Sequence, residues 1–351
     1  MTVIPHSRPW IADADVAALT AVLRSHQVGA GALGVELEHA LASWIGAAGG
    51  VAVASGAAAL ELALHTLNCG AGDEIILPTY VCRHLLEAVL NVGASPVFCD
   101  VGPDWLVRRA NITRVSTPRT RALIIPHLYG RFADTISMCD LGIPVIEDFA
   151  QAVAGRGMVK LAGEIGIFSL HPTKCFTAGE GGMLVARTND LVESARRWRD
   201  GSAGSIARRQ FAPLADMAAA LALSQLHRYD AFLERREVIA TRYANAALCW
   251  PGVRLTPSGS PFDMPFRFAF HHACGLPAFA RRFAEKGITV RRGVDELLHR
   301  LCNLTDAAFV QSVAHFNTTL SLPIHPELSE IDVDRVIAAA DNIFGTLMPD
   351  S

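Results

Sequence analysis

The stretch FSLHPTKCFTAGEGG, Phe168 to Gly182, joins an apolar run to a glycine-rich turn, with Lys174 between them. An apolar run followed by such a turn is typical of a buried strand that ends in a loop. Only three of the 31 lysines and arginines are lysines: Lys160, Lys174 and Lys286. Arginine stays protonated in proteins, whereas a desolvated lysine can lose its proton and form a Schiff base. Lys174 is therefore a candidate reactive amine.

A lone lysine in a loop is more often simply solvated, and composition alone favours that interpretation. Lys160, in GRGMVKLAG, has the sequence of a surface hairpin. Lys286 stands at the charged end of a predicted helix, directly before a glycine. Whether Lys174 differs from them depends on what else the fold brings beside it.

Length and composition limit the class of protein. A chain of 351 residues can bury a large core, and one large domain with a smaller one is the natural expectation. Hydrophobic residues make up 51% and charged residues 19%, which excludes a disordered or fibrous chain. The net charge of −3 and the scattered arginines give no reason to expect a nucleic acid or an anionic membrane as partner.

The sequence predicts a cytoplasmic protein without a metal site. No apolar stretch approaches the ~18–20 residues that span a bilayer, and the polar N-terminus, broken by prolines, does not resemble a secretory signal. The 13 histidines include no HExxH pattern. The cysteines show no CxxC spacing and are expected to be reduced thiols; they are Cys69, Cys82, Cys99, Cys139, Cys175, Cys249, Cys274 and Cys302.

Strand-like and helix-like segments alternate from about residue 50. The apolar runs are continuous, as in strands that are covered on both faces. Strands that alternate with helices predict an α/β domain with a mostly parallel sheet. The strand-like segments are GVAVAS, DEIILPTY, SPVFCDV, RALIIPHLYG, IPVIEDF, GIFSLHP and GGMLVAR.

The sequence of the C-terminal third predicts a separate, smaller α+β domain. Residues ~214–247 predict one long helix that leads out of the large domain. A strand-like segment, MPFRFAFHHACGL, and further helices follow. We place the boundary near residue 236, within about ten residues. The large, cofactor-binding domain is then 1–236, with the N-terminal segment, and the small domain is 237–351.

Candidate ligand-binding residues follow several of the strands. In open α/β sheets, ligands bind outside the carboxyl ends of the strands. Ser55-Gly56-Ala57 opens a helix after the first strand, and the amides of a helix N-terminus suit a phosphate. Asp148 ends a buried strand and lies three residues before Gln151. Lys174 lies 26 residues after Asp148, and Ser169 precedes it at the end of another predicted strand. A buried aspartate is costly unless it meets a cation or hydrogen-bond donors.

Each of these features has a simpler explanation when it is taken alone. The Ser-Gly-Ala stretch can be an ordinary N-cap, Asp148 a cap for the next segment, and Lys174 a loop lysine. Together they supply a phosphate cradle, a carboxylate for a pyridinium nitrogen and a lysine amine. Pyridoxal 5′-phosphate needs this combination, and the order along the chain suits a fold-type-I enzyme.

Several stretches resemble the pyridoxal-phosphate sugar aminotransferases of the DegT/DnrJ/StrS type. The resemblance covers nearly the whole chain, from SRPWI to the last helix, and implies a fold-type-I aminotransferase. The Asp-x-x-Gln stretch and the lysine followed by GEGG are specific in combination. The stretches are VASGAAALELAL, GDEIILPTY, VIEDFAQAVAG, FSLHPTKCFTAGEGGMLVA and LPIHPELSEIDVDRVI.

The resemblance also implies roles for particular residues. Lys174 would carry the Schiff base and move the proton between two carbon atoms, and Asp148 would pair with the pyridine nitrogen. Gln151 would hydrogen-bond the ring oxygen. Ser169 and the amides of Gly56–Ala57 would hold the phosphate. The family implies a homodimer in which the partner subunit completes each site.

Four departures from the family pattern weaken any statement about the substrate. Ala57 replaces a threonine and removes a hydroxyl donor. Cys82 stands where an aromatic residue usually stacks on the cofactor. Phe211 and Pro213 occupy the places of an Asn-x-Arg motif that contacts the neighbouring site. Arginines follow Gly287-Ile288, where a His-Tyr pair is common.

The preferred hypothesis is a transaminase of amino-sugar biosynthesis. It would move an amino group from an amino acid, glutamate in much of the family, to a keto-sugar, usually nucleotide-linked. Related dehydratases carry histidine at the position of Lys174, so the lysine argues against them. The alternatives are a cofactor-binding sensory or scaffolding protein with little turnover, and a chain in which Lys174 is a loop lysine and Asp148 a cap.

Overall fold

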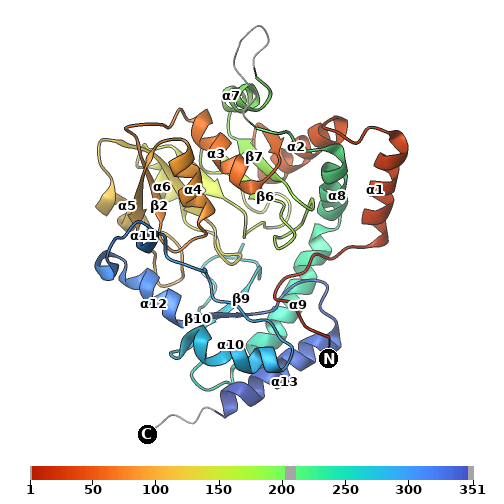
Figure 1. Ribbon diagram of the computed structural model, residues 1–351, viewed down its shortest axis with the longest axis vertical. Coiled ribbons are helices and arrows are strands. Elements are labelled where there is room, and N and C mark those ends of the chain that lie inside the picture. Colours follow the sequence, from red (N-terminus) through yellow and green to blue (C-terminus); the bar gives the residue numbers. More distant parts are fainter. Residues whose placement is uncertain (1, 202–210, 347–351) are drawn as a thin grey trace.

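The structure, a computed structural model, describes residues 2–201 and 211–346 (Figure 1). Its centre is a seven-stranded sheet with the order β1-β7-β6-β5-β4-β2-β3. β7 runs antiparallel to both its neighbours, and all other pairs are parallel. The mostly parallel sheet and the α/β class are as predicted. The strands are β1 (Gly49–Val53), β2 (Glu74–Pro78), β3 (Ser95–Cys99), β4 (Thr120–Pro126), β5 (Val145–Asp148), β6 (Ile165–Ser169) and β7 (Gly182–Ala186).

Helices cover the large sheet, which explains why its strands are apolar without alternation. Every residue of β1, β2, β5 and β7 is buried. Two N-terminal helices, which the sequence analysis did not predict, pack beside α8 (Figure 1). The helices of this part are α1 (Asp13–Ser25), α2 (Ala32–Ile45), α3 (Gly56–Thr66), α4 (His84–Asn91), α5 (Arg109–Val115), α6 (Thr135–Cys139), α7 (Asn189–Asp200) and α8 (Asp216–His227).

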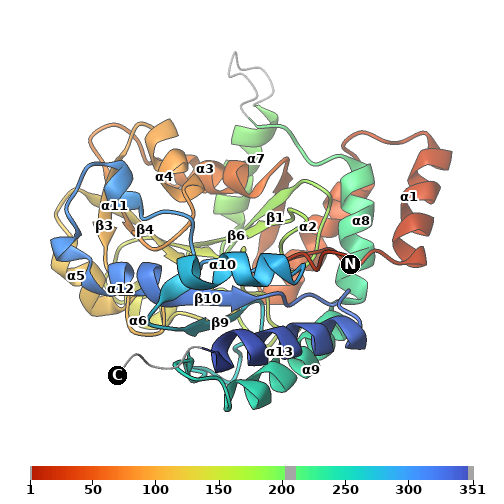
Figure 2. The same ribbon diagram turned by 60° about the horizontal axis from the view of Figure 1, so that its bottom comes forward.

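A second, antiparallel sheet of three strands, in the order β10-β9-β8, forms the C-terminal part. Helices α9, α10 and α13 gather around it (Figure 2) and share one apolar core with it. The elements are α9 (Tyr229–Ala247), β8 (Arg254–Leu255), β9 (Phe268–His271), α10 (Gly275–Glu285), α11 (Leu298–Leu301), the 3₁₀ helix Asp306–Ala308, α12 (Val310–Thr318), β10 (Thr319–Leu322) and α13 (Glu330–Gly345).

The single long helix predicted over 214–247 is wrong. α8 ends at His227 and α9 begins at Tyr229, because Arg228 leaves the helical conformation, at φ −104° and ψ 9°. The Arg228 guanidinium donates to the carboxylate of Asp15 on α1, at 2.6 Å. No proline or glycine lies at this break, so the sequence does not predict it. The contact between Arg228 and Asp15 is a tertiary contact at the break.

The boundary that we propose near residue 236 falls inside α9. The core around the small sheet takes its α9 residues from Ile239 onward. It also includes Ile4 from the N-terminal segment, which forms a bridge with Ile288. The two parts of the chain therefore share one helix, and the first residues pack with the last.

Candidate active site

A cavity of about 410 Å³ opens at the carboxyl ends of β5 and β6, beside the start of α3. Five of the six residues that we predicted for the cofactor site line this cavity: Gly56, Ala57, Asp148, Ser169 and Lys174. They come from three places in the sequence, more than 110 residues apart at the extremes, and the parallel sheet brings them together.

The start of α3 forms one wall of the cavity. The Ser55 side chain caps the helix by accepting from the amide of Ala58, at 3.1 Å. The first amides of a helix have no partner within it, so they are free to bind an anion. A Cβ on Gly56 would lie 2.7 Å from the Cβ of Ser169, and one on Gly182 would lie 2.1 Å from the carbonyl oxygen of Ser55. Glycine at both positions therefore allows the end of β6 and the start of β7 to approach this helix end.

Asp148 is the last residue of β5 and is only 7% exposed. One carboxylate oxygen accepts from the amide of Ala150 at 2.9 Å, so Asp148 also caps the next segment. Burial raises the pKa of Asp148, and the Ala150 amide and the positive charge of Lys174 oppose this only in part. A cationic partner in the cavity would stabilise the ionised carboxylate.

Hydrogen bonds to the buried carboxylate of Glu147 fix the strand that carries Asp148. Glu147 accepts from His127 at 3.1 Å, and from the amides of Ala162 and Gly163 at 2.8 Å each. Although burial acts to raise the pKa of Glu147, its bonds with His127 and with the two amides hold it below the ordinary value. This side chain connects β4, β5 and the segment before β6.

Lys174 lies half-buried in the loop between β6 and β7. The amide of Leu170 donates to the carbonyl of Gly181 at 2.9 Å and closes the base of this loop. The amide of Lys174 donates to the carbonyl of His171 at 2.9 Å. The loop thus presents the amine to the cavity that also contains Asp148.

Gln151 is the predicted residue that does not line the cavity. Its side-chain oxygen accepts from the amide of Tyr129, at 3.4 Å, in the turn after β4. Tyr129 is in the left-handed region, at φ 60°, and its hydroxyl donates to the hydroxyl of Tyr80 at 3.1 Å.

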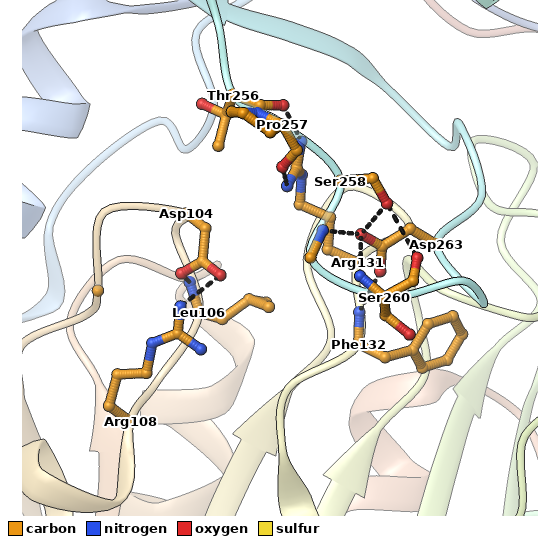
Figure 3. Close-up of polar contacts among 12 residues, drawn as sticks. Asp104, Leu106, Arg108, Arg131, Phe132, Thr256, Pro257, Ser258, Ser260 and Asp263 are labelled. Atoms are coloured by element: carbon orange, nitrogen blue, oxygen red, sulfur yellow. Dashed lines mark hydrogen bonds and ion pairs between the residues drawn. The ribbon is translucent and has the colours of Figure 1, made fainter.

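A loop of the C-terminal part holds this turn in place (Figure 3). The Arg131 guanidinium donates to the carbonyls of Thr256 and Pro257, at 2.5 and 2.7 Å. The carboxylate of Asp263 accepts from the amide of Phe132 at 3.1 Å, and from Ser258 at 2.9 Å. The turn that touches Gln151 is therefore fixed by residues more than 120 positions later in the chain.

The residues that depart from the family pattern have definite places. Cys82 lines the cavity, and Ala57 lines it without a hydroxyl. Phe211 is 7% exposed and packs in the large core, and Pro213 bridges to Val53. Arg208 to Gln210, which precede them, lie outside the described residues.

Gly293 lies in the segment where the family commonly has a His-Tyr pair. A Cβ on Gly293 would lie 2.0 Å from the hydroxyls of both Tyr80 and Tyr129. Two tyrosines thus fill the space that a larger side chain would need. Asp295, two residues further on, lines the cavity, and sequence reasoning missed it because no local pattern marks it.

The fold and the lysine-bearing cavity define the class of protein as an α/β aminotransferase. Comparison with known proteins identifies the family. The model of the DegT/DnrJ/EryC1/StrS aminotransferase family matches residues 9–341, and the chain belongs to this family. It is an enzyme that uses pyridoxal 5′-phosphate and acts on small-molecule substrates.

Individual relatives agree over almost the full length. The spore coat polysaccharide biosynthesis protein SpsC of Bacillus subtilis (strain 168) is 30% identical, over 97% of each chain. The aminotransferase TlmJ from Streptoalloteichus hindustanus is 27% identical, with a TM-score of 0.90 over 99% of this chain and 100% of that one. DesV of S. venezuelae is 27% identical, with a TM-score of 0.84 over 93% of each chain. Among the described residues, no helix is both long and apolar enough to cross a membrane.

Proposed function

We propose that the protein transfers an amino group from an amino acid, glutamate in the first instance, to the carbonyl carbon of a nucleotide-linked keto-sugar in amino-sugar biosynthesis. The observation that carries this proposal is the cavity that joins Lys174, Asp148, Ser169 and the start of α3. The name of SpsC, a polysaccharide biosynthesis protein, supports a sugar as the acceptor.

The residues present fit the cofactor. The close approach of Ser169 to Gly56, which a Cβ would block, leaves a hydroxyl and free helix amides side by side for the phosphate. In the same cavity, the buried carboxylate of Asp148 suits the protonated ring nitrogen. We propose Gly56, Ala57 and Ser169 for the phosphate and Asp148 for the nitrogen. Gln151, whose side-chain oxygen accepts from the amide of Tyr129, would donate to the ring oxygen with its NH2 group.

Pyridoxal phosphate supplies, when bound, an electrophilic carbon and a ring that withdraws electrons from the substrate Cα–H bond. Asp148 would keep a proton on the ring nitrogen, since its carboxylate gains most from a cationic partner in a buried place. The Lys174 amine would bind the cofactor at rest. Once free, it would take the proton from Cα of the donor and return one during the second half-reaction. The hydrogen bond between Glu147 and His127 would position Asp148 by fixing β5.

The absorbance spectrum of the purified protein, with and without glutamate, tests this proposal. We expect a band of lysine-bound cofactor that glutamate shifts to the amine form of the cofactor. Borohydride reduction followed by mass spectrometry should place the adduct on Lys174, and Lys174→Ala should lose both the band and all transamination. Lys160→Ala is the matched control and should retain them. A bound cofactor that no amino acid alters would instead favour a sensory or scaffolding protein.

We also propose a cytoplasmic homodimer in which the partner subunit completes each site. Lys174 is the only lysine or arginine among the described residues that line the cavity, which is little positive charge for a phosphate. Light scattering coupled to size-exclusion chromatography should give twice the mass of the chain. A fully active monomer would contradict the shared site.

A further inference from the structure

The turn after β4 connects Gln151 with two buried tyrosines. The amide of Arg131 donates to the carbonyl of Leu128 at 2.8 Å and closes this turn. Its two central residues, Tyr129 and Gly130, both have positive φ, at 60° and 88°. A tyrosine keeps this left-handed conformation only where its surroundings enforce it, and residues of this kind cluster at functional sites.

The backbone of this turn determines which way the side-chain amide of Gln151 points. A backbone N–H can only donate, so the Gln151 atom that lies 3.4 Å from the nitrogen of Tyr129 is the oxygen. The NH2 group points away from the turn, is open to solvent, and has no hydrogen-bond partner among the described residues. Ala150, the residue before Gln151, lines the active-site cavity, so Gln151 lies at its edge.

The side chain of Tyr129 anchors the turn. It is 3% exposed, and its ring lies edge-on to that of Trp105, with the ring centres 5.2 Å apart. Its hydroxyl donates to the hydroxyl of Tyr80 at 3.1 Å, and Tyr80 is fully buried. Burial raises the pKa of both phenols, so both remain protonated at neutral pH.

Gly293 leaves the space that this pair of hydroxyls occupies. A Cβ there would lie 2.0 Å from both oxygens. The segment that carries Gly293 is held against the end of β2, because the amides of Leu298 and His299 donate to the carbonyl and the hydroxyl of Thr79, at 3.1 and 2.9 Å. A methyl group at position 293 would therefore have to displace the two phenols.

We propose that Tyr129 and Tyr80 are positioning residues that hold the turn so that Gln151 presents its NH2 group to the ring oxygen of the cofactor. Neither tyrosine lines the cavity, so both act through Gln151. A hydrogen bond to this oxygen stabilises its negative charge. The proton on the nitrogen that joins Lys174 to the cofactor is then held less tightly, and the pKa of that nitrogen falls. The inference rests on the proposed function, because it requires Lys174 to carry the cofactor.

Titration of the absorbance of the resting holoenzyme with pH measures this pKa without any substrate. In Gln151→Leu the pKa should rise by about 1–2 pH units, the effect of one lost hydrogen bond to a charged group. Gly293→Ala should give a similar rise, and Tyr129→Phe, which removes only the hydroxyl, a rise of roughly 0.5–1 pH unit. Tyr243→Phe is the matched control and should leave the pKa unchanged, since its buried hydroxyl donates to the carbonyl of Pro323 in the core of the small sheet.

A double variant separates positioning from a general structural effect. If Tyr129 acts through Gln151, adding Tyr129→Phe to Gln151→Leu should raise the pKa no further. A wild-type pKa in Gln151→Leu or in Tyr129→Phe, or a further rise in the double variant, would overturn the proposal. Tyr129→Phe decides alone if Gly293→Ala does not fold. The other titratable side chains that line the cavity are the same in every variant and cause no difference between them: Cys82, His84, Asp148, His171, Glu180 and Asp295.

Borohydride reduction distinguishes a failure of this inference from a failure of the proposed function. An adduct on Lys174 in wild type and in each variant shows that the cofactor is bound as proposed, so a pKa that does not move counts against the two tyrosines alone. Bound cofactor without an adduct on Lys174 in wild type would contradict the role of the lysine, and the inference would fall with it.

Discussion

The contact between Gly56 and Ser169 makes the proposed phosphate cradle testable with a single methyl group. In Gly56→Ala the new Cβ would lie 2.7 Å from the Cβ of Ser169 and 3.0 Å from its Oγ. Ordinary contact begins at 3.4 Å, so Ser169 and the start of α3 must separate by 3.4 − 2.7 = 0.7 Å or more. Such a shift takes the hydroxyl out of hydrogen-bond geometry with a phosphate that the α3 amides hold in place.

The expected effect is on cofactor affinity more than on folding. Loss of one hydrogen bond to a charged group costs about 1.5–3 kcal/mol, which weakens cofactor binding roughly ten- to a hundredfold. Overpacking costs about 1–3 kcal/mol of stability, and replacing glycine returns about 0.4–1 kcal/mol through the unfolded chain. The net loss of ~0–3 kcal/mol leaves a protein of ordinary stability folded.

Titration of cofactor-free protein with pyridoxal phosphate, followed by absorbance, measures this effect. Gly29→Ala is the control, because a Cβ there has no neighbour within 4 Å. Ser169→Ala should weaken binding by a similar factor, and adding Gly56→Ala to it should cost little more, since both remove one contact. A folded Gly56→Ala protein that binds the cofactor within about threefold of wild type would refute the role of Ser169.

Three further predictions concern residues in and below the cavity. Asp148→Asn should leave the protein folded but nearly inactive. Because burial raises the pKa of Asp148 in the folded state, its ionised carboxylate destabilises the fold at pH 7, and cofactor-free Asp148→Asn should melt above wild type there. This difference in melting temperature should shrink as the pH falls toward the ordinary aspartate pKa of 3.8. Full activity of Asp148→Asn would exclude the proposed role of Asp148. Glu147→Gln should lose about 1.5–3 kcal/mol in denaturant unfolding at pH 7. Because the pKa of Glu147 is lowered in the folded state, its ionised carboxylate stabilises the fold at pH values above the ordinary glutamate pKa of 4.5, and the loss should diminish as the pH falls below that value. The control Glu285→Gln, at an exposed side chain, should change the unfolding free energy little. Cys82, which lines the cavity, should react with a thiol reagent more slowly when the cofactor is bound, while the exposed Cys249 reacts at an unchanged rate; equal protection of both thiols would indicate a global change instead.

The strands and the order of the site residues could be predicted from the sequence because their causes are local. A continuous apolar run such as Ile75–Leu77 is stable mainly in a sheet that is covered on both faces. Because parallel strands present their carboxyl ends at one edge, Asp148 and Lys174 could be expected in the same cavity. The helix after Ser55 could also be predicted, from its N-cap and its apolar stripe.

The tertiary structure decided the features that depend on contacts between distant residues. The helix breaks at Arg228, which pairs with Asp15, and no residue at the break predicts it. The side chain of Gln151 meets the turn after β4, which a loop from the small sheet holds.

Gly293 faces two tyrosine hydroxyls from positions 80 and 129, and Asp295 reaches the cavity from the C-terminal part. Sequence patterns report which face of an element is apolar. Where a side chain ends, and whether it finds a partner, depends on packing between segments hundreds of residues apart, which no local pattern encodes.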